Sequence, residues 1–276
     1  MIKMKYQSGF TLIEIAIVLL IVGILLGYTV ALLPVQKELS RYRDVEKDMD
    51  RIVDALIGFA QVQGRLPCPD ISGGAAYDGR ENTDDVADNV TGALLPGGDG
   101  ITDSCEGYFG FLPKVTLGLN GPANATNNLL DPWGQRYGYA ISDINAGADS
   151  LVDLVTTNGI RREGLNAMIA NPPDLNICDS SPGAGNNLTC PAANTVIANV
   201  AVVIISLGKD YRIDALGNAS SAIQTENIDD FDDGTNDKVY VSSTRSEATG
   251  AEYDDVIRWI SPSHLFANMI AAEQLP

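Results

Sequence analysis

Residues 9–33 read GFTLIEIAIVLLIVGILLGYTVALL, and this stretch decides how the rest of the chain can be organised. No residue from Ile15 to Leu33 is charged, a length close to the roughly 20 apolar residues with which a helix crosses a bilayer. The small-residue cleavage site of a secretory signal does not follow, because Pro34 leads directly into a charged segment. We therefore expect residues 10–33 to form a transmembrane helix that stays in the mature protein.

One carboxylate, Glu14, lies at the edge of this apolar run, where burial in lipid is costly unless a partner neutralises the charge. The residues from Gly9 to Glu14, GFTLIE, resemble the cleavage motif of type IV prepilins and type II secretion pseudopilins. The resemblance implies that a prepilin peptidase cuts after Gly9, removes the basic leader, residues 1–9, and methylates the new N-terminal amine of Phe10. It also implies that Glu14 meets the N-terminal amine of a neighbouring subunit. Such a pair sets the axial register of assembly, because misaligned docking leaves it unpaired.

Residues 34–64 are expected to continue the helix as an amphipathic segment. Apolar residues recur there at intervals of three or four and form one stripe: Val35, Leu39, Tyr42, Val45, Met49, Ile52, Leu56 and Phe59. Pro34 predicts a kink or a local interruption. The stripe covers barely four heptads and stops at Gly64, which favours packing beneath a globular head over a bare coiled coil.

Residues 65–276 are expected to form that head. Four segments read as short strands separated by turn signals, at residues 129–141, 196–207, 238–242 and 255–260. A small antiparallel sheet with one apolar face on the C-terminal half of the helix would bury both surfaces. The predicted fold class is therefore α+β, a long N-terminal helix with a small antiparallel β-sheet head, similar to type IV pilins.

Three short sequences in the head also resemble pseudopilin heads. DPWG, at residues 131–134, resembles the start of one of their strands. SLGKD, at residues 206–210, resembles the strand end that precedes their calcium loop, and DDVIRW, at residues 254–259, resembles their terminal strand. The segment 172–191 has no counterpart that we can name.

The four cysteines, Cys68, Cys105, Cys178 and Cys190, form no CxxC pair, and the single His264 cannot complete a zinc site. An even number of cysteines in a chain with an export-type N-terminus predicts two disulfides in an oxidising compartment. Four cysteines allow three connectivities. We favour the pairing of sequence neighbours, Cys68 with Cys105 and Cys178 with Cys190, over free buried thiols.

The chain holds 18 basic and 36 acidic residues, and its net charge of −18 would repel nucleic acid, so nucleic-acid binding is not expected. The residues 226–237 are densely acidic and contain a glycine, a composition that suits the oxygen coordination of calcium. A solvated acidic loop explains this composition equally well. The candidate ligands are Asp229, Asp230, Asp232, Asp233 and Asp237; a weaker second group is Asp99, Asp103 and Glu106. No other cofactor is expected.

An enzyme is not expected. No nucleophile elbow, phosphate-binding loop, zinc-protease motif or dinucleotide fingerprint is present, and His264 reads as a helix-start or surface residue. The resemblance instead implies a structural subunit, a minor pilin or minor pseudopilin of a type IV pilus-like or type II secretion filament. Its implied partners are prepilin peptidase, other pilin or pseudopilin subunits and the inner-membrane assembly platform.

The precursor would lie in the inner membrane with its head in the periplasm. The mature form would lie in a periplasmic or cell-surface filament of a Gram-negative-type bacterium. Two alternatives stay open: a membrane-tethered adhesin or binding module with the same anchor, and, less favoured, an anchored periplasmic hydrolase. A requirement for Glu14 in filament incorporation would separate the filament subunit from the adhesin, and hydrolytic activity of the head would indicate the hydrolase.

Overall fold

The structure is a computed structural model that describes residues 11–71, 77–83, 105–144, 153–181, 188–209, 226–227, 238–248 and 251–275, with the backbone alone for residues 27–33. The chain divides into two compact units, residues 1–44 and 45–276. The 52-residue helix α1 (Leu12–Gln63) contributes to both units. Among the residues that the structure describes, two shorter helices, α2 (Gly159–Ala170) and α5 (Pro262–Ala271), belong to the second unit.

The apolar stripe of α1 is buried only in the second unit. Val45, Met49, Ile52 and Leu56 have no exposed surface, which confirms the stripe over these residues. Val35 and Leu39 are 60% and 50% exposed, so the expectation that the stripe is buried from residue 35 onward is wrong. These two residues belong to the first unit, whereas the core begins at Val45. The helix also runs through Pro34 without the interruption that the sequence suggested, although proline removes one helical hydrogen bond.

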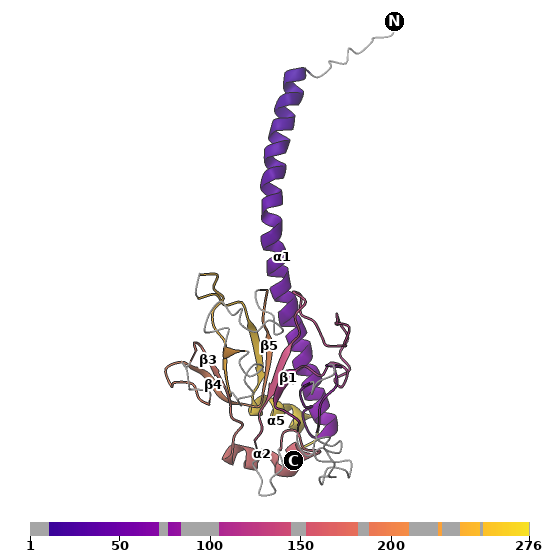
Figure 1. Cartoon of the computed structure of the whole chain (residues 1–276), viewed down its shortest axis with the longest axis vertical. Helices are drawn as coiled ribbons and strands as arrows, with labels where there is room; N and C mark the ends of the chain where they lie inside the picture. The colour runs from indigo at the N-terminus through magenta and orange to yellow at the C-terminus, as the bar shows by residue number, and fades with distance from the viewer. Residues whose placement is uncertain are drawn as a thin grey trace. The chain divides into compact units, whose positions relative to one another are not determined.

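The described residues of the second unit form two sheets, where the sequence predicted one (Figure 1). The first is antiparallel with the order β1-β2-β5-β7, and its strands are β1 (Phe109–Phe111), β2 (Gly138–Ile141), β5 (Val202–Ser206) and β7 (Val256–Ile260). The second has the order β4-β3-β6, and its strands are β3 (Leu175–Cys178), β4 (Thr195–Val200) and β6 (Val239–Val241). Strand β3 pairs antiparallel with β4 but parallel with β6.

The first sheet has an apolar core on each face. Along β2, Tyr139 and Ile141 belong to the core that includes the stripe of α1, whereas Ala140 belongs to a core shared with Ile177 and Tyr240 of the second sheet. Since side chains alternate across a strand, the first sheet lies between α1 and the second sheet. The expectation that only one face of the sheet is apolar is therefore wrong, because the second sheet covers the other face.

Two of the four predicted strands differ from what the structure shows. The run 196–207 is divided between β4 and β5, which belong to different sheets and meet at Ala201. Asn199 has a positive φ of 61°, within a register shift between β3 and β4. A bulge at this place bends the strand and redirects the chain. The run 129–141 contains only the short strand β2, because its first half forms a turn.

That turn is built around Asp131. Its Oδ1 accepts hydrogen bonds from the backbone N–H groups of Trp133 and Gln135, at 2.9 and 2.8 Å. Its Oδ2 accepts a hydrogen bond of 2.6 Å from Ser206, the last residue of β5. Burial raises the pKa of the Asp131 carboxyl. The DPWG sequence thus folds as a carboxylate-centred turn fastened to the end of the neighbouring strand.

A charged cluster connects the two sheets. Lys238, which precedes β6, pairs with Asp143, which follows β2, and with Asp174, which precedes β3. Asp174 also accepts a hydrogen bond of 2.5 Å from Ser142. These contacts join three segments that are far apart in the sequence, so they stabilise the position of the second sheet on the first.

The segment after α1, residues 66–70, is fastened at both ends. Tyr139 of β2 donates a buried hydrogen bond of 2.9 Å to the carbonyl oxygen of Pro67. Asp70 exchanges two backbone hydrogen bonds with Phe111 of β1, at 2.8 and 2.9 Å. The segment therefore runs beside the edge of the first sheet.

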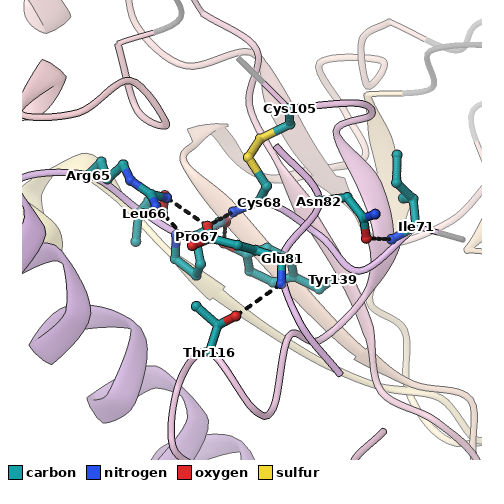
Figure 2. The surroundings of a disulfide bond; sticks show 10 residues. All are labelled: Arg65, Leu66, Pro67, Cys68, Ile71, Glu81, Asn82, Cys105, Thr116 and Tyr139. Atoms are coloured by element: carbon teal, nitrogen blue, oxygen red, sulfur yellow. Dashed lines mark hydrogen bonds and ion pairs between the residues drawn. A yellow bond between two sulfur atoms is a disulfide. The ribbon is translucent and has the colours of Figure 1, made fainter. Parts of the chain in front are cut away.

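An ion pair and a disulfide hold the middle of this segment (Figure 2). Arg65 donates to both carboxylate oxygens of Glu81, at 2.7 and 2.9 Å, and Glu81 also accepts a hydrogen bond of 3.1 Å from the backbone N–H of Cys68. Cys68 is bonded to Cys105 across a sequence separation of 37, with a Cα–Cα distance of 5.4 Å. The guanidinium, the carboxylate and the disulfide together bind the residues around 81 and 105 to the end of α1.

The second disulfide joins Cys178, the last residue of β3, to Cys190, with a Cα–Cα distance of 5.6 Å. It closes the loop within the segment 172–191. Both disulfides have the pairing that the sequence favoured. The segment itself supplies β3, so it forms part of the second sheet.

The buried ion pair gives a testable expectation. Glu81→Gln keeps the shape of the side chain but leaves the guanidinium of Arg65 without its charged partner, and we expect a loss of about 3 kcal/mol in the free energy of unfolding. Replacing both residues by leucine should cost less than Glu81→Gln alone, since no charge is then left buried. Urea unfolding of the oxidised full chain in detergent measures both. Equal losses for Glu81→Gln and for the double variant would contradict this role.

Candidate assembly site

The start of α1 is closed by a reciprocal cap between Thr11 and Glu14. The backbone N–H of Glu14 donates to Oγ1 of Thr11 at 3.3 Å, and the backbone N–H of Thr11 donates to Oε2 of Glu14 at 3.5 Å. This is a capping box, in which two side chains satisfy backbone donors that the first helical turn leaves unpaired. The carboxylate of Glu14 is therefore exposed and turned back toward the N-terminal end of the helix.

The helix that follows this cap is apolar on all sides in its first turns. From Leu12 to Leu26 the only charged residue is Glu14, and the large apolar side chains are between 43% and 90% exposed. Over the residues that the structure describes, no helix combines the length and the apolar character of a membrane span. The side chains of residues 27–33, which belong to the predicted span, lie outside the described residues.

The predicted processing residues, Gly9 and Phe10, lie outside the described residues. Their position in the sequence determines where a new N-terminal amine would form. A cut after Gly9 would create an amine on Phe10, the residue directly before Thr11. The carboxylate of Glu14 accepts a hydrogen bond from the backbone N–H of Thr11, the residue that would follow this amine in the sequence.

The predicted calcium ligands Asp229, Asp230, Asp232, Asp233 and Asp237 also lie outside the described residues, as do Asp99 and Asp103. Glu106 is described and exposed. In the described part of the chain, no three His, Cys, Asp or Glu residues lie close enough to hold a metal ion. The calcium site stays a prediction.

A polar contact that the sequence did not suggest lies at the start of β7. The side chain of Asn227 donates to the carbonyl oxygen of Val241 at 3.0 Å and to Oδ2 of Asp255 at 2.7 Å, and it accepts from the backbone N–H of Val241 at 2.7 Å. The side chain of Asn227 therefore forms two hydrogen bonds with the backbone of Val241, the last residue of β6, as a neighbouring strand would. No local pattern reveals this, because the three residues come from separate segments.

The burial of Asp255 lowers the stability of the fold. Burial raises the pKa of its carboxyl to about 8, against the hydrogen bond from Asn227, and the neighbouring charge of Asp254 adds to the shift. Its Oδ1 has no hydrogen-bond partner among the described residues. The carboxyl is therefore protonated in the folded chain near neutral pH.

The residue before it, Asp254, accepts a hydrogen bond of 2.7 Å from the backbone N–H of Lys209. Gly208 has a φ of +66°, and a Cβ atom there would lie 2.4 Å from Oδ2 of Asp254. Glycine is thus required for the chain to pass so close to the carboxylate. The sequences SLGKD and DDVIRW are brought together by this contact.

His264 lies in the first turn of α5 and is exposed, as the sequence indicated. Its backbone N–H donates to Oγ of Ser261, the N-cap residue of the helix, at 3.3 Å. Its part in the structure is therefore that of a helix-start residue.

The pKa of Asp255 predicts a pH dependence with a definite sign. The folded state keeps a proton that the unfolded state releases above its ordinary value of 3.8, so Asp255 makes the free energy of unfolding fall as the pH rises from about 4 to about 8. The fall is at most about 1.4 kcal/mol per pH unit. Asp255→Asn removes this dependence, and its stability relative to the parent should improve steadily between pH 5 and pH 8. Urea unfolding of both chains with a chelator present would show it, and parallel pH profiles would contradict it.

Comparison with known proteins assigns the N-terminal segment. Residues 4–30 match the family described as the prokaryotic N-terminal methylation motif. No curated protein and no solved structure matches the chain. The matched residues include the capping box of Thr11 and Glu14 and most of the apolar segment 10–33. Residues 4–30 are therefore a prokaryotic N-terminal methylation motif, the type IV prepilin-like signal motif.

Proposed function

We propose that the chain is a structural subunit of a type IV pilus-like or type II secretion filament, processed by prepilin peptidase after Gly9. The observation that carries this proposal is the methylation motif at residues 4–30, with Glu14 fixed at the start of α1. Proteins with this motif are typically structural and not enzymes. The proposed parts are a leader at residues 1–9, a transmembrane and assembly helix at 10–33, an amphipathic continuation at 34–64 and a head at 65–276.

Glu14 would act as the register device of assembly. Processing places a positively charged amine on Phe10, at the helix end where the macrodipole is also positive, and both favour a carboxylate nearby. In lipid each charge is expensive without the other. A subunit whose Glu14 meets the amine of its neighbour is stabilised, and one that docks at another height leaves two charges unpaired.

The head favours a minor pilin or minor pseudopilin within this class. It contains two sheets, two disulfides and the additional segment 172–191, and so it is larger than a compact shaft subunit requires. The precursor would lie in the inner membrane with the head in the periplasm, where disulfides are stable. The assembly platform and other pilin-like subunits would be its partners.

The capping box allows the charge of Glu14 to be tested apart from its local role. Glu14→Gln keeps a side chain that can complete a capping box but removes the charge, whereas Glu14→Ala removes both. We expect both variants to insert into the membrane and both to lose most of their incorporation into sheared filaments. Asp44→Asn, at an exposed carboxylate elsewhere on α1, is the matched control and should incorporate normally. If Glu14→Gln enters filaments as well as the parent does, the pairing of charges is not what Glu14 provides.

Calcium binding by the acidic segment 229–237 is a second part of the proposal. Calcium accepts irregular coordination by six to eight oxygens, whereas magnesium requires a tight octahedron. Millimolar calcium should therefore raise the melting temperature of the full chain in detergent, by an amount that corresponds to about 2.7 kcal/mol at a hundredfold excess over Kd. Magnesium should raise it much less. Equal shifts for the two ions, or a calcium shift that survives Asp232→Ala with Asp233→Ala, would identify a solvated acidic loop.

A further inference from the structure

The chain contains two Asn-Gly pairs, Asn120-Gly121 and Asn158-Gly159. In such a pair the backbone nitrogen of the glycine can attack the side-chain amide carbon of the asparagine, because glycine has no Cβ atom to hinder the approach. The attack closes a five-membered succinimide ring and releases ammonia. Water then opens the ring to aspartate or isoaspartate. Both pairs consist of the same two residues, so a difference in their reactivity has to come from the fold.

The pair Asn120-Gly121 is open to this reaction. Both residues are exposed and lie outside the helices and strands of the structure. Within the part of the chain that the structure describes, neither the side chain of Asn120 nor the backbone N–H of Gly121 forms a hydrogen bond. The glycine nitrogen can therefore approach the amide carbon without first losing a hydrogen bond.

The pair Asn158-Gly159 is held in place at the start of α2. The backbone N–H of Gly159 donates to the carbonyl oxygen of Thr156 at 2.7 Å. Oδ1 of Asn158 accepts a hydrogen bond of 2.9 Å from Arg161. Gly159 is also buried, and a Cβ atom there would lie 2.2 Å from the carbonyl oxygen of Asp153. Attack at this pair has to break both hydrogen bonds in a crowded place, and each one slows the reaction by roughly two- to tenfold.

We propose that Asn120 is a site of spontaneous deamidation in the folded chain and that the fold protects Asn158. The reaction replaces a neutral amide by a carboxylate, so it makes the net charge of −18 more negative by one unit. The isoaspartate product also lengthens the backbone by one atom. A Cβ atom at the neighbouring Gly121 would lie 3.3 Å from Nη2 of Arg51, so the new charge arises beside α1. Folded chains thus become more acidic with age at one defined position.

Ageing of the oxidised full chain in detergent near neutral pH tests the proposal. Tryptic cleavage separates the two asparagines into the peptides 115–136 and 137–161. Mass spectrometry follows the replacement of an amino group by a hydroxyl group, and chromatography separates aspartyl from isoaspartyl peptides. Because two hydrogen bonds protect Asn158, we expect conversion at Asn120 to be at least about fivefold faster. Conversion at Asn120 should also accelerate as the pH rises, since the attacking nitrogen has to lose its proton.

The same chain unfolded in urea is the matched control. Without the fold, the two Asn-Gly pairs should convert at similar rates. Asn120→Gln should show no conversion at this position, because its longer side chain cannot close the five-membered ring, and its melting temperature should equal that of the parent. Equal conversion of both asparagines in the folded chain would overturn the proposal. So would an Asn120 that stays intact in the folded chain but converts in urea.

Discussion

The second unit depends on the burial of one narrow apolar stripe. Val45, Met49, Ile52, Leu56 and Ala60 are wholly buried, while the opposite face of the same helix is charged and exposed. A helix with this distribution is stabilised mainly by packing, and the first sheet supplies the surface. That sheet in turn has apolar side chains on both faces, so it requires the second sheet. The buried stripe of α1 therefore requires the first sheet, and the first sheet requires the second.

The head places several polar groups where they lower stability unless other contacts compensate. The cost of burying Asp131 is offset by its hydrogen bonds from the backbone of its own turn and from Ser206. The cost of burying Arg65 is offset by its ion pair with Glu81. The cost of burying Asp255 is offset only in part, since one of its carboxyl oxygens has no hydrogen-bond partner among the described residues. These groups fix particular pairings between distant segments, because a misplaced segment would leave a charge or a donor buried and unpaired.

The sequence predicted what depends on local pattern. The apolar run, the basic leader and the position of Glu14 identified the methylation motif, and the periodicity from Val45 onward identified the buried face of α1. The division of residues 196–207 into two strands was missed, because a single polar residue, Asn199, in an otherwise apolar run does not by itself mark the bulge that redirects the chain. Strands β1 and β3 were missed because three or four residues are too few for a period to be read. The contact of Asn227 with Val241 joins separate segments, so no local rule predicts it.

In the proposed function, Glu14 and the methylation motif determine what the chain does. The intact mass of the protein purified from its native membrane tests this most directly. We predict a chain that lacks residues 1–9, begins at Phe10 and carries one methyl group on its N-terminal amine. A mature chain that still begins at Met1, or that begins anywhere after Leu33, would contradict it.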